Sequence, residues 1–240
     1  MEVYLITGAT SGIGQSVYRR LSNKYSCLLI GRNKTKLNEL IKDRDNQLCY
    51  ACDLAITDEI KNIFEYCAER KFKINGLIYC AGLSHVCDFV DIPSQSYRDA
   101  FCVNVFAFIE MCKYCFKYPN LCDDARIITI SSIAADRASA RQAVYASTKA
   151  ALNNAIISAA QEGIRHNTKI NGISLGVCDT PMLANMNTSE TFRNNIERHY
   201  PLGMIDPNTV AEVVEDLLSE KFKNMTGSII RIDSGFYVVH

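Results

Sequence analysis

Short apolar runs alternate with longer amphipathic segments along the whole chain. Seven of the runs are apolar on successive residues, as strands covered on both faces are. They span Val3–Ile6, Cys27–Ile30, Leu48–Ala51, Gly76–Cys80, Arg126–Ile130, Lys169–Ser174 and Ser228–Ile232. In the intervening segments apolar residues return every three or four positions, which predicts helices. These segments are Gly14–Lys24, Thr35–Lys42, Asp58–Lys71, Gln95–Tyr118, Tyr145–Arg165 and Pro207–Lys221. The alternation predicts an α/β fold, a Rossmann-like doubly wound parallel sheet of about seven strands with helices on both faces.

Nothing in the chain separates one folded unit from another. It contains no internal repeat, low-complexity tract or Pro/Ser-rich linker, so residues 1–240 are predicted to form a single domain. The segment 181–205 interrupts the alternation with polar, Asn-rich sequence. Irregular segments of this kind often cover binding sites, and we expect this one to act as a substrate lid.

Charge and hydropathy exclude several classes of protein. The 26 Lys and Arg residues balance the 26 Asp and Glu residues, so the chain lacks the basic excess of a dedicated nucleic-acid or anionic-membrane binder. The N-terminus has no apolar region long enough for a signal peptide, and no run reaches about 18 apolar residues. We therefore expect a cytoplasmic protein with no nucleic-acid and no membrane partner.

Cysteine is the one unusual residue type. The chain has 11 Cys, an odd count that argues against a disulfide framework and for a reducing compartment. Two Cys-x-x-Cys pairs, Cys49/Cys52 and Cys112/Cys115, have the spacing of zinc ligands. The first pair lies on a predicted strand, where positions three apart face opposite ways, and the second lies in an apolar helix stripe. We expect both pairs to pack in the core and no metal to bind.

A glycine-rich turn follows the first strand directly. Residues 7–14 read TGATSGIG and lead at once into a predicted helix. Glycines let such a turn tighten and bring backbone N–H groups close to a pyrophosphate, which the helix N-terminus also stabilises. The placement of this motif between a strand and a helix predicts a dinucleotide site.

The end of the second strand bears on the choice of nicotinamide cofactor. NAD-specific proteins carry an acidic residue there that holds the ribose hydroxyls, but this chain has Gly31 followed by Arg32. The Arg32 guanidinium can pair with a 2′-phosphate, which favours NADP(H) over NAD. The alternative interpretation is that Arg32 is an ordinary solvated loop residue.

Ser132, Tyr145 and Lys149 form the pattern that carries chemistry. Tyr145 and Lys149 are four positions apart on a predicted helix and share one face. A free tyrosine has a pKa of about 10, and a nearby ammonium group is expected to lower the pKa of Tyr145 toward neutrality. Ser132 stands at the carboxyl end of a predicted strand, where it can hydrogen-bond a substrate oxygen. Taken alone, the Tyr-x-x-x-Lys spacing also fits an ordinary amphipathic helix.

In this order along the chain, these motifs resemble the short-chain dehydrogenase/reductase family, and within it the 3-oxoacyl-acyl-carrier-protein reductases. The resemblance covers essentially all 240 residues. Its further motifs are Asp53-Leu54, Ala81-Gly82, Asn104, Asn171, Gly176–Met182, Thr226-Gly227 and Ile232–Gly235. The resemblance implies hydride transfer between a nicotinamide and a ketone or secondary alcohol.

The resemblance also implies roles for individual residues. Tyr145 is the expected proton donor, and Ser132 is the expected partner of the substrate oxygen. Lys149 would tune Tyr145 and bind the nicotinamide ribose, and Asn104 would anchor a water-linked proton relay. The implied cofactor-binding residues are Gly8, Thr10, Ser11, Gly12, Ile13, Gly14, Arg32, Asp53, Leu54, Ala81, Gly82, Tyr145, Lys149, Gly176, Cys178 and Thr180. The implied substrate-binding residues are Ser132, Gln142, Tyr145, Met182 and Met186.

The chain departs from the family pattern at three places. Tyr79-Cys80 stands where the family usually has two Asn, one of which ties neighbouring strands together. Leu175 replaces the proline of a Pro-Gly turn, and Ser234 replaces a glycine near the C-terminus. None of these changes falls on a catalytic residue, so we expect an active enzyme.

The substrate is the least determined part of the prediction. Reductases of carrier-bound acyl groups need a basic patch beside the entrance, for which Lys113, Lys117 and Arg126 are the candidates, although Gln161 stands where such enzymes often carry Arg. A 3-oxoacyl thioester, carried by an acyl-carrier protein, is one interpretation. The alternatives are a sugar or another small polar ketone, and a non-catalytic NADP-binding regulatory protein.

The two longest predicted helices bear on assembly. Segments 95–118 and 145–165 carry apolar residues on more than one face, which predicts burial on two sides. Family members pair these helices between subunits, so the resemblance implies a homotetramer or homodimer. The alternative is a monomer whose helices pack only against its own sheet.

Overall fold

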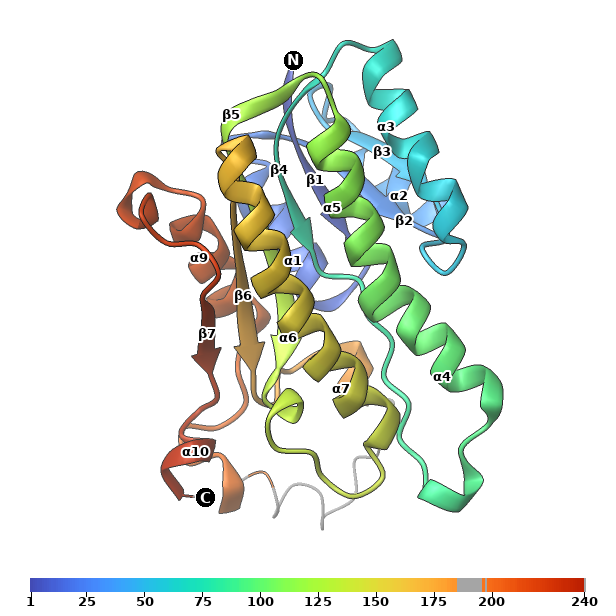
Figure 1. Ribbon diagram of the computed structural model, residues 1–240, viewed down its shortest axis with the longest axis vertical. Helices are drawn as coiled ribbons and strands as arrows, with labels where there is room; N and C mark the ends of the chain where they lie inside the picture. Colours follow the sequence, from blue (N-terminus) through green and yellow to red (C-terminus); the bar gives the residue numbers. More distant parts are fainter. Residues whose placement is uncertain (185–195, 197, 240) are drawn as a thin grey trace.

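Parallel strands make the central sheet of the computed structural model, which describes residues 1–184, 196 and 198–239 (Figure 1). Within these residues the sheet has 7 strands in the order β3-β2-β1-β4-β5-β6-β7, and each neighbouring pair is parallel. The strands are β1 (Glu2–Thr7), β2 (Ser26–Gly31), β3 (Leu48–Ala51), β4 (Lys73–Tyr79), β5 (Leu121–Ser132), β6 (Lys169–Leu175) and β7 (Ile229–Ile232). The predicted doubly wound parallel sheet is confirmed.

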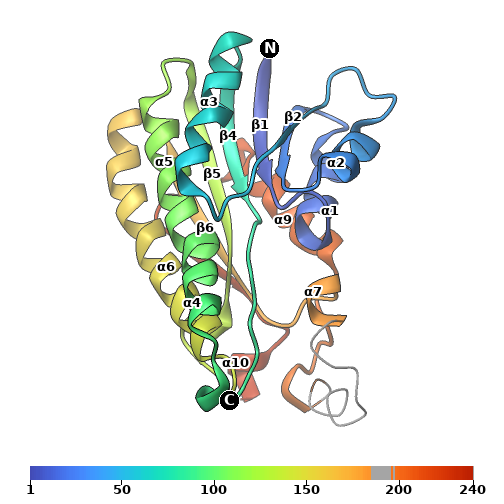
Figure 2. The ribbon, with the colours of Figure 1, turned by 90° about the vertical axis from the view of Figure 1, so that its right-hand side faces the viewer.

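Helices cover both faces of this sheet. In Figure 2, α3, α4, α5 and α6 lie on one side, whereas α1, α2 and α9 lie on the other. The helices are α1 (Gly12–Leu21), α2 (Lys34–Ile41), α3 (Ile60–Glu69), α4 (Ser94–Phe101), α5 (Ala107–Lys117), α6 (Ala143–Gly163), α7 (Pro181–Ala184), α9 (Pro207–Leu217) and α10 (Phe236–Val239). Short 3₁₀ turns are η1 (Thr57–Glu59), η2 (Phe89–Asp91), η4 (Ile133–Ala135), η5 (Ile164–His166) and η6 (Glu220–Phe222).

The strands are buried on both faces. On β1, Val3 and Leu5 belong to the core cluster that includes residues of α3, α5 and α6. Tyr4 and Ile6, which alternate with them, belong to the cluster that includes residues of α1 and α9. Because both faces of the strand need apolar side chains, the sequence shows continuous apolar runs instead of alternation.

Local sequence sets several helix starts. Asp206 precedes α9, where its side chain accepts a hydrogen bond from Asn208 N at 2.8 Å, and Pro207 fits the first helical position. Asn33 caps α2 in the same way, accepting from Lys36 N at 3.0 Å. These caps satisfy backbone N–H groups that have no partner inside the helix.

The predicted helix over 95–118 is divided in the structure. A π-helical turn, η3 (Cys102–Phe106), joins α4 to α5, and at its end the Ala107 N–H donates to the Cys102 carbonyl, five residues back. Such a turn holds one residue more than an α-helical turn and occurs frequently at functional sites. Apolar periodicity did not reveal it, because one added residue shifts the phase without ending the amphipathic pattern.

The cysteines lie where packing explains them. Cys52 is in the core on the α3 side of the sheet, whereas Cys49 packs against the cluster on the opposite face. Cys112 and Cys115 are both buried in the core. Among the residues that the structure describes, no three His, Cys, Asp or Glu side chains gather as metal ligands would. Within the same residues, no helix has the length and apolarity needed to cross a membrane.

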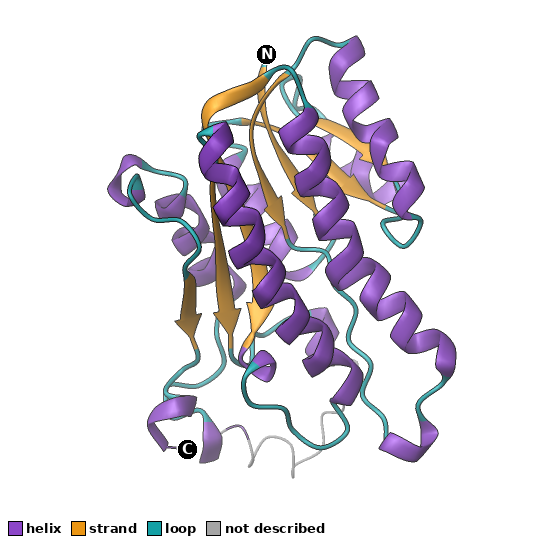
Figure 3. Ribbon diagram, in the orientation of Figure 1, coloured by secondary structure: helices purple, strands orange, loops and turns teal. Residues whose placement is uncertain are grey.

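The strand order opens a cleft at the carboxyl edge of the sheet. β1 lies between β2 and β4, so the chain leaves β1 and β4 in opposite directions, and ligands bind at such a reversal in doubly wound sheets. In Figure 3 the strand arrows point toward the lower end of the view, and the longer loops extend from that carboxyl edge. Of the predicted lid over 181–205, residues 185–195 and 197 lie outside the described residues, so the lid stays a prediction.

Candidate active site

The glycine turn closes tightly onto the start of α1. Gly8 and Gly12 have φ values of +65° and +53°, in the left-handed region that favours glycine. A Cβ on Gly14 would lie 2.4 Å from the Gly8 carbonyl oxygen, so this position has no room for a side chain. The turn therefore brings backbone against backbone at the helix N-terminus, as a pyrophosphate site requires.

A cleft runs from this turn along the carboxyl ends of the strands. The sequence-predicted cofactor residues that line its first part are Gly8, Thr10, Ser11, Arg32, Asp53, Leu54, Ala81 and Gly82. Arg32 is exposed at the margin, and the Asp53 carboxylate accepts a hydrogen bond from Ala55 N at 3.0 Å. The glycine turn and this open wall fit the shape and chemistry of a dinucleotide.

The departure at Tyr79-Cys80 does not break the local hydrogen bonding. Thr7 Oγ1 accepts hydrogen bonds from Cys80 N and Ala81 N, each at 3.1 Å, and so joins the ends of β1 and β4. The Tyr79 hydroxyl donates to the Val103 carbonyl at 2.5 Å. Other side chains therefore tie these elements together where the family pattern has asparagine.

Asn104 lies in η3 and is fully buried. Its Oδ1 accepts from Leu83 N at 2.7 Å, and its Nδ2 donates to the Leu83 carbonyl at 2.9 Å. Nδ2 also donates to Thr148 Oγ1 at 2.8 Å. This one side chain links the loop after β4 to the helix that carries Tyr145 and Lys149.

The three residues predicted to carry the chemistry meet at the carboxyl edge of the sheet. Ser132 is the last residue of β5, and Tyr145 and Lys149 lie one turn apart on α6. Ser132 and Tyr145 line the wall of one cavity. Lys149 Nζ donates to the Ile130 carbonyl at 2.8 Å and lies 5.7 Å from the centroid of the Tyr145 ring.

Burial dominates the acid–base properties of this group. Burial raises the pKa of Tyr145 above its ordinary value of 10, and the nearby Ser132 side chain opposes the rise. The same desolvation lowers the pKa of Lys149 to about 8, although the nearby Cys80 thiol opposes this change. The expected net lowering of the Tyr145 pKa by Lys149 is therefore wrong for this structure, because desolvation of the phenol is the largest influence on that pKa and raises it. A protonated Tyr145 at neutral pH suits a proton donor.

A cavity of about 190 Å³ lies in front of these side chains. The sequence-predicted residues on its wall are Ile13, Gly82, Ser132, Gln142, Tyr145, Lys149, Gly176, Cys178, Thr180 and Met182. Met186, also predicted there, lies outside the described residues. Sequence reasoning missed Arg137, Tyr200 and Phe236, which also line the cavity. They come from loops and from the short α10, and no local pattern marks them as neighbours of the site.

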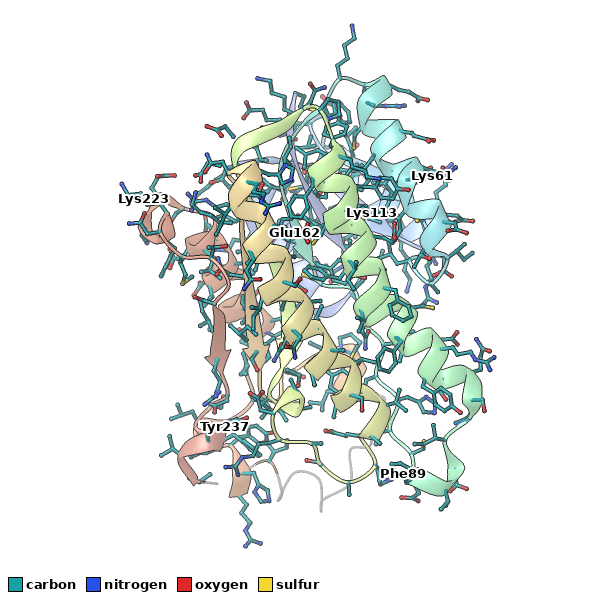
Figure 4. All side chains as sticks on the ribbon, viewed as in Figure 1. Lys61, Phe89, Lys113, Glu162, Lys223 and Tyr237 are labelled. Carbon is teal, nitrogen blue, oxygen red and sulfur yellow. The ribbon has the colours of Figure 1, made fainter. Side chains whose placement is uncertain are left out.

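The predicted basic patch is wrong as an entrance feature. Arg126 is only 4% exposed, and its guanidinium binds the carboxylates of Asp124 and Glu220, each at 2.8 Å. Lys113 pairs with Glu110 on α5, away from the carboxyl edge (Figure 4), and Lys117 ends that helix shortly before β5 begins. Lys113, Lys117 and Arg126 do not border the cavity. They lie toward the start of β5, at the opposite edge of the sheet.

Known proteins match this chain along nearly its entire length. A family model described as enoyl-(acyl carrier protein) reductase matches residues 8–237. The 3-oxoacyl-acyl-carrier-protein reductase of Thermotoga maritima is 25% identical over 243 residues, covering 99% of this chain and 98% of that protein. Among solved structures, 4-hydroxyisoleucine dehydrogenase complexed with NADH has a TM-score of 0.92 at 23% identity, with 99% of each chain covered. A variant actinorhodin polyketide ketoreductase with NADPH has a TM-score of 0.90 at 23% identity, covering 98% of this chain and 97% of that one. At these identities the two solved structures bear on the fold alone.

Proposed function

This chain belongs to the short-chain dehydrogenase/reductase family and is an oxidoreductase, and from that premise we propose that it reduces a ketone to a secondary alcohol with NADPH. The observation that carries the proposal is that Ser132, Tyr145 and the buried Lys149 line one cavity at the carboxyl edge of the sheet. This arrangement offers a protonated phenol and a second hydroxyl to one substrate oxygen.

The residues of the chain account for the proton transfer. The cofactor, when bound, supplies the hydride that reduces the carbonyl carbon. The Ser132 and Tyr145 hydroxyls bind the carbonyl oxygen, and Tyr145 donates its proton to that oxygen as negative charge develops there. Lys149 then stabilises the phenolate and passes a proton back to it. Asn104, which bonds Leu83 in the loop after β4 and Thr148 on α6, anchors the relay that restores the proton on Lys149.

NADP(H) is the cofactor that we assign to the cleft. The glycine turn at residues 8–14 would hold the pyrophosphate, and Asp53 and Leu54 would hold the adenine end. Gly31 leaves no carboxylate at the end of β2, and Arg32 lines the same cleft with its guanidinium available to a 2′-phosphate. Lys149, Gly176, Cys178 and Thr180 line the adjoining cavity, where the nicotinamide end would lie.

A 3-oxoacyl thioester is the substrate that the cavity wall favours. Ile133, Val177, Leu183 and Phe236 give that wall a largely apolar character, which fits an acyl chain better than a sugar. An acyl-carrier protein is the partner such a substrate implies, and it would dock without Lys113, Lys117 or Arg126, none of which borders the cavity. A small polar ketone is the second candidate, because the hydroxyl and amide groups of Ser139 and Gln142 also line the cavity.

A homotetramer or homodimer is the assembly that we propose. Phe106, Ile109 and Ile157 lie on the adjacent elements η3, α5 and α6, where their side chains are 49%, 47% and 43% exposed. Large apolar side chains that remain half-exposed on neighbouring helices suit an interface with a second copy of the chain. Light scattering at micromolar concentration tests this assembly, and a monomer mass would contradict it.

Oxidation of NADPH measures the proposed reaction. The purified chain is assayed with acetoacetyl thioester and with a panel of keto sugars and small ketones. Turnover of the thioester supports the first substrate, whereas turnover of the small ketones alone supports the second. Tyr145→Phe is expected to abolish turnover, and Tyr97→Phe, at an exposed position on α4, serves as the matched control. Full activity in Tyr145→Phe would refute the assignment of the proton donor, and no turnover of any carbonyl by the unaltered chain would favour a non-catalytic NADP-binding protein.

A further inference from the structure

We propose that Tyr79 is a positioning residue of the active site, whose hydroxyl holds the π turn η3 in the conformation that presents Asn104. The proposal rests on the relay role given to Asn104 under the proposed function. It is carried by contacts that join the end of β4 to η3, and η3 to the loop after β4 and to α6.

Tyr79, at the end of β4, contacts the π turn through its hydroxyl and the helix after that turn through its ring. It is the last residue of β4 and is 1% exposed. Its hydroxyl donates to the Val103 carbonyl inside η3 at 2.5 Å. Its ring packs edge-to-face on Phe108, just beyond η3, with centroids 5.6 Å apart. The same side chain therefore fixes the turn by a hydrogen bond and the following helix by a ring contact.

The Val103 carbonyl lacks the hydrogen bond that an α-helix would give it. In an uninterrupted α-helix it would accept a hydrogen bond from the Ala107 N–H, four residues on. In the π turn the Ala107 N–H donates instead to Cys102. The Tyr79 hydroxyl donates to the Val103 carbonyl where this α-helical bond is absent, and loss of a hydrogen bond to a buried carbonyl is destabilising. Loss of the hydroxyl consequently favours movement of the turn.

Movement of the turn would reach the catalytic residues through Asn104. Asn104 follows Val103 and makes two hydrogen bonds to Leu83, at 2.7 and 2.9 Å. Its bond to Thr148, at 2.8 Å, holds the residue next to Lys149. A shift of the η3 backbone would therefore weaken the contacts of Asn104 with the loop after β4 and with the catalytic helix together. Small displacements of such groups are costly to reaction rates.

Tyr79→Phe removes the hydroxyl and keeps the ring. Tyr118→Phe is the matched control, because the Tyr118 hydroxyl also donates to a backbone carbonyl, that of Phe72 at 2.8 Å, and is likewise buried. Tyr118 ends the α5 segment far from Asn104 in the fold, since it lies at the amino end of β5. The two variants should show similar shifts in the midpoint of thermal unfolding, so a difference between them at the active site is not a general loss of stability.

Hydrogen exchange at the Leu83 amide tests the proposal without any enzyme assay, because that amide donates to Asn104. In Tyr79→Phe we expect exchange to accelerate by about tenfold, and in Tyr118→Phe we expect no change. Unchanged exchange in Tyr79→Phe, or equal acceleration in both variants, would overturn the proposal. This measurement decides the matter even if the unaltered chain turns over no carbonyl substrate, in which case only the proposed function fails.

Kinetics supply the second readout. Tyr79→Phe is expected to lower kcat by about tenfold while leaving the KM for NADPH nearly unchanged, because the relay and not the glycine turn is disturbed. In an Asn104→Ala background the same substitution should lower kcat no further, since Tyr79 acts through Asn104. An equal additional loss of kcat in both backgrounds would show that Tyr79 acts elsewhere and would refute the positioning role.

Discussion

Lys149→Met should make the ligand-free protein more stable near neutral pH while abolishing turnover. Burial lowers the pKa of Lys149 from 10.5 to about 8, so the folded protein binds this proton less tightly than the unfolded chain does. A difference of this size corresponds to about 3 kcal/mol of lost stability when the ammonium is charged in both states. The hydrogen bond from Nζ to the Ile130 carbonyl is lost in the variant and offsets about 1 kcal/mol of the gain. The expected net gain at about pH 7 is therefore about 2 kcal/mol.

The stability advantage of Lys149→Met should decrease as the pH rises. Below the folded pKa of about 8 the cost of the buried ammonium is fully present. As pH rises toward the unfolded value of 10.5, the proton leaves both states and the cost disappears. The advantage of Lys149→Met in the free energy of unfolding should thus shrink by about 2 kcal/mol between about pH 7 and about pH 10.

Urea denaturation at both pH values, at one fixed protein concentration, measures these free energies. Lys61→Met, at an exposed position of α3, is the matched control, and its effect should be small and independent of pH. The reasoning is refuted if Lys149→Met is no more stable than the unaltered chain at the lower pH and the difference between them does not change with pH. A more stable but inactive variant would show that the site keeps a charged group at a cost in stability.

Three further outcomes test the cofactor site and the acid–base group. Gly14→Ala would place a methyl group 2.4 Å from the Gly8 carbonyl oxygen, so we expect a loss of about 1–3 kcal/mol of stability and weakened NADPH binding, measured by thermal unfolding and by fluorescence titration. Arg32→Asp should weaken NADPH binding by about 10- to 100-fold and favour NADH, since it removes a charge-assisted contact to the 2′-phosphate, whereas unchanged NADPH affinity would show that Arg32 is only a surface cation. Burial raises the pKa of Tyr145 above 10, so its hydroxyl should stay protonated through about pH 8–9. Loss of the Tyr145 proton should therefore lower the reductive kcat only at higher pH. A pH–rate profile in which that loss is centred near neutrality would contradict the last expectation.

The sequence was most informative where chemistry depends on the ends of parallel strands. Thr7, Ser132 and the glycine turn are close in the fold because every strand of a parallel sheet delivers its carboxyl end to the same edge. The four-residue spacing of Tyr145 and Lys149 likewise fixes their common face on α6. These relations follow from periodicity, so they could be predicted without coordinates.

Other properties depend on burial and on contacts between distant segments. Arg126 was predicted as a surface cation, but its guanidinium is enclosed by carboxylates and by backbone carbonyls of Leu217 and Ser219 about 90 residues away. The direction of the Tyr145 pKa shift depends on how far the phenol is desolvated, which its spacing from Lys149 does not encode. The contact of Tyr79 with Val103 depends on a π turn that leaves no trace in the hydrophobic pattern.

The extra residue in η3 makes segment length a constraint in its own right. Each residue turns an α-helix by about 100°. The one extra residue in the π turn therefore rotates the buried face of α4 relative to the buried face of α5. Deleting one residue between 102 and 106 would restore an even helix and rotate α4 by that angle relative to α5, turning the buried Ala100 away from its place in the fold. Substitutions at the same positions would leave this phase intact. Variants of this enzyme should therefore tolerate changes in the composition of this segment, apart from Asn104, more readily than insertions or deletions, even though its apolar pattern is that of one ordinary helix.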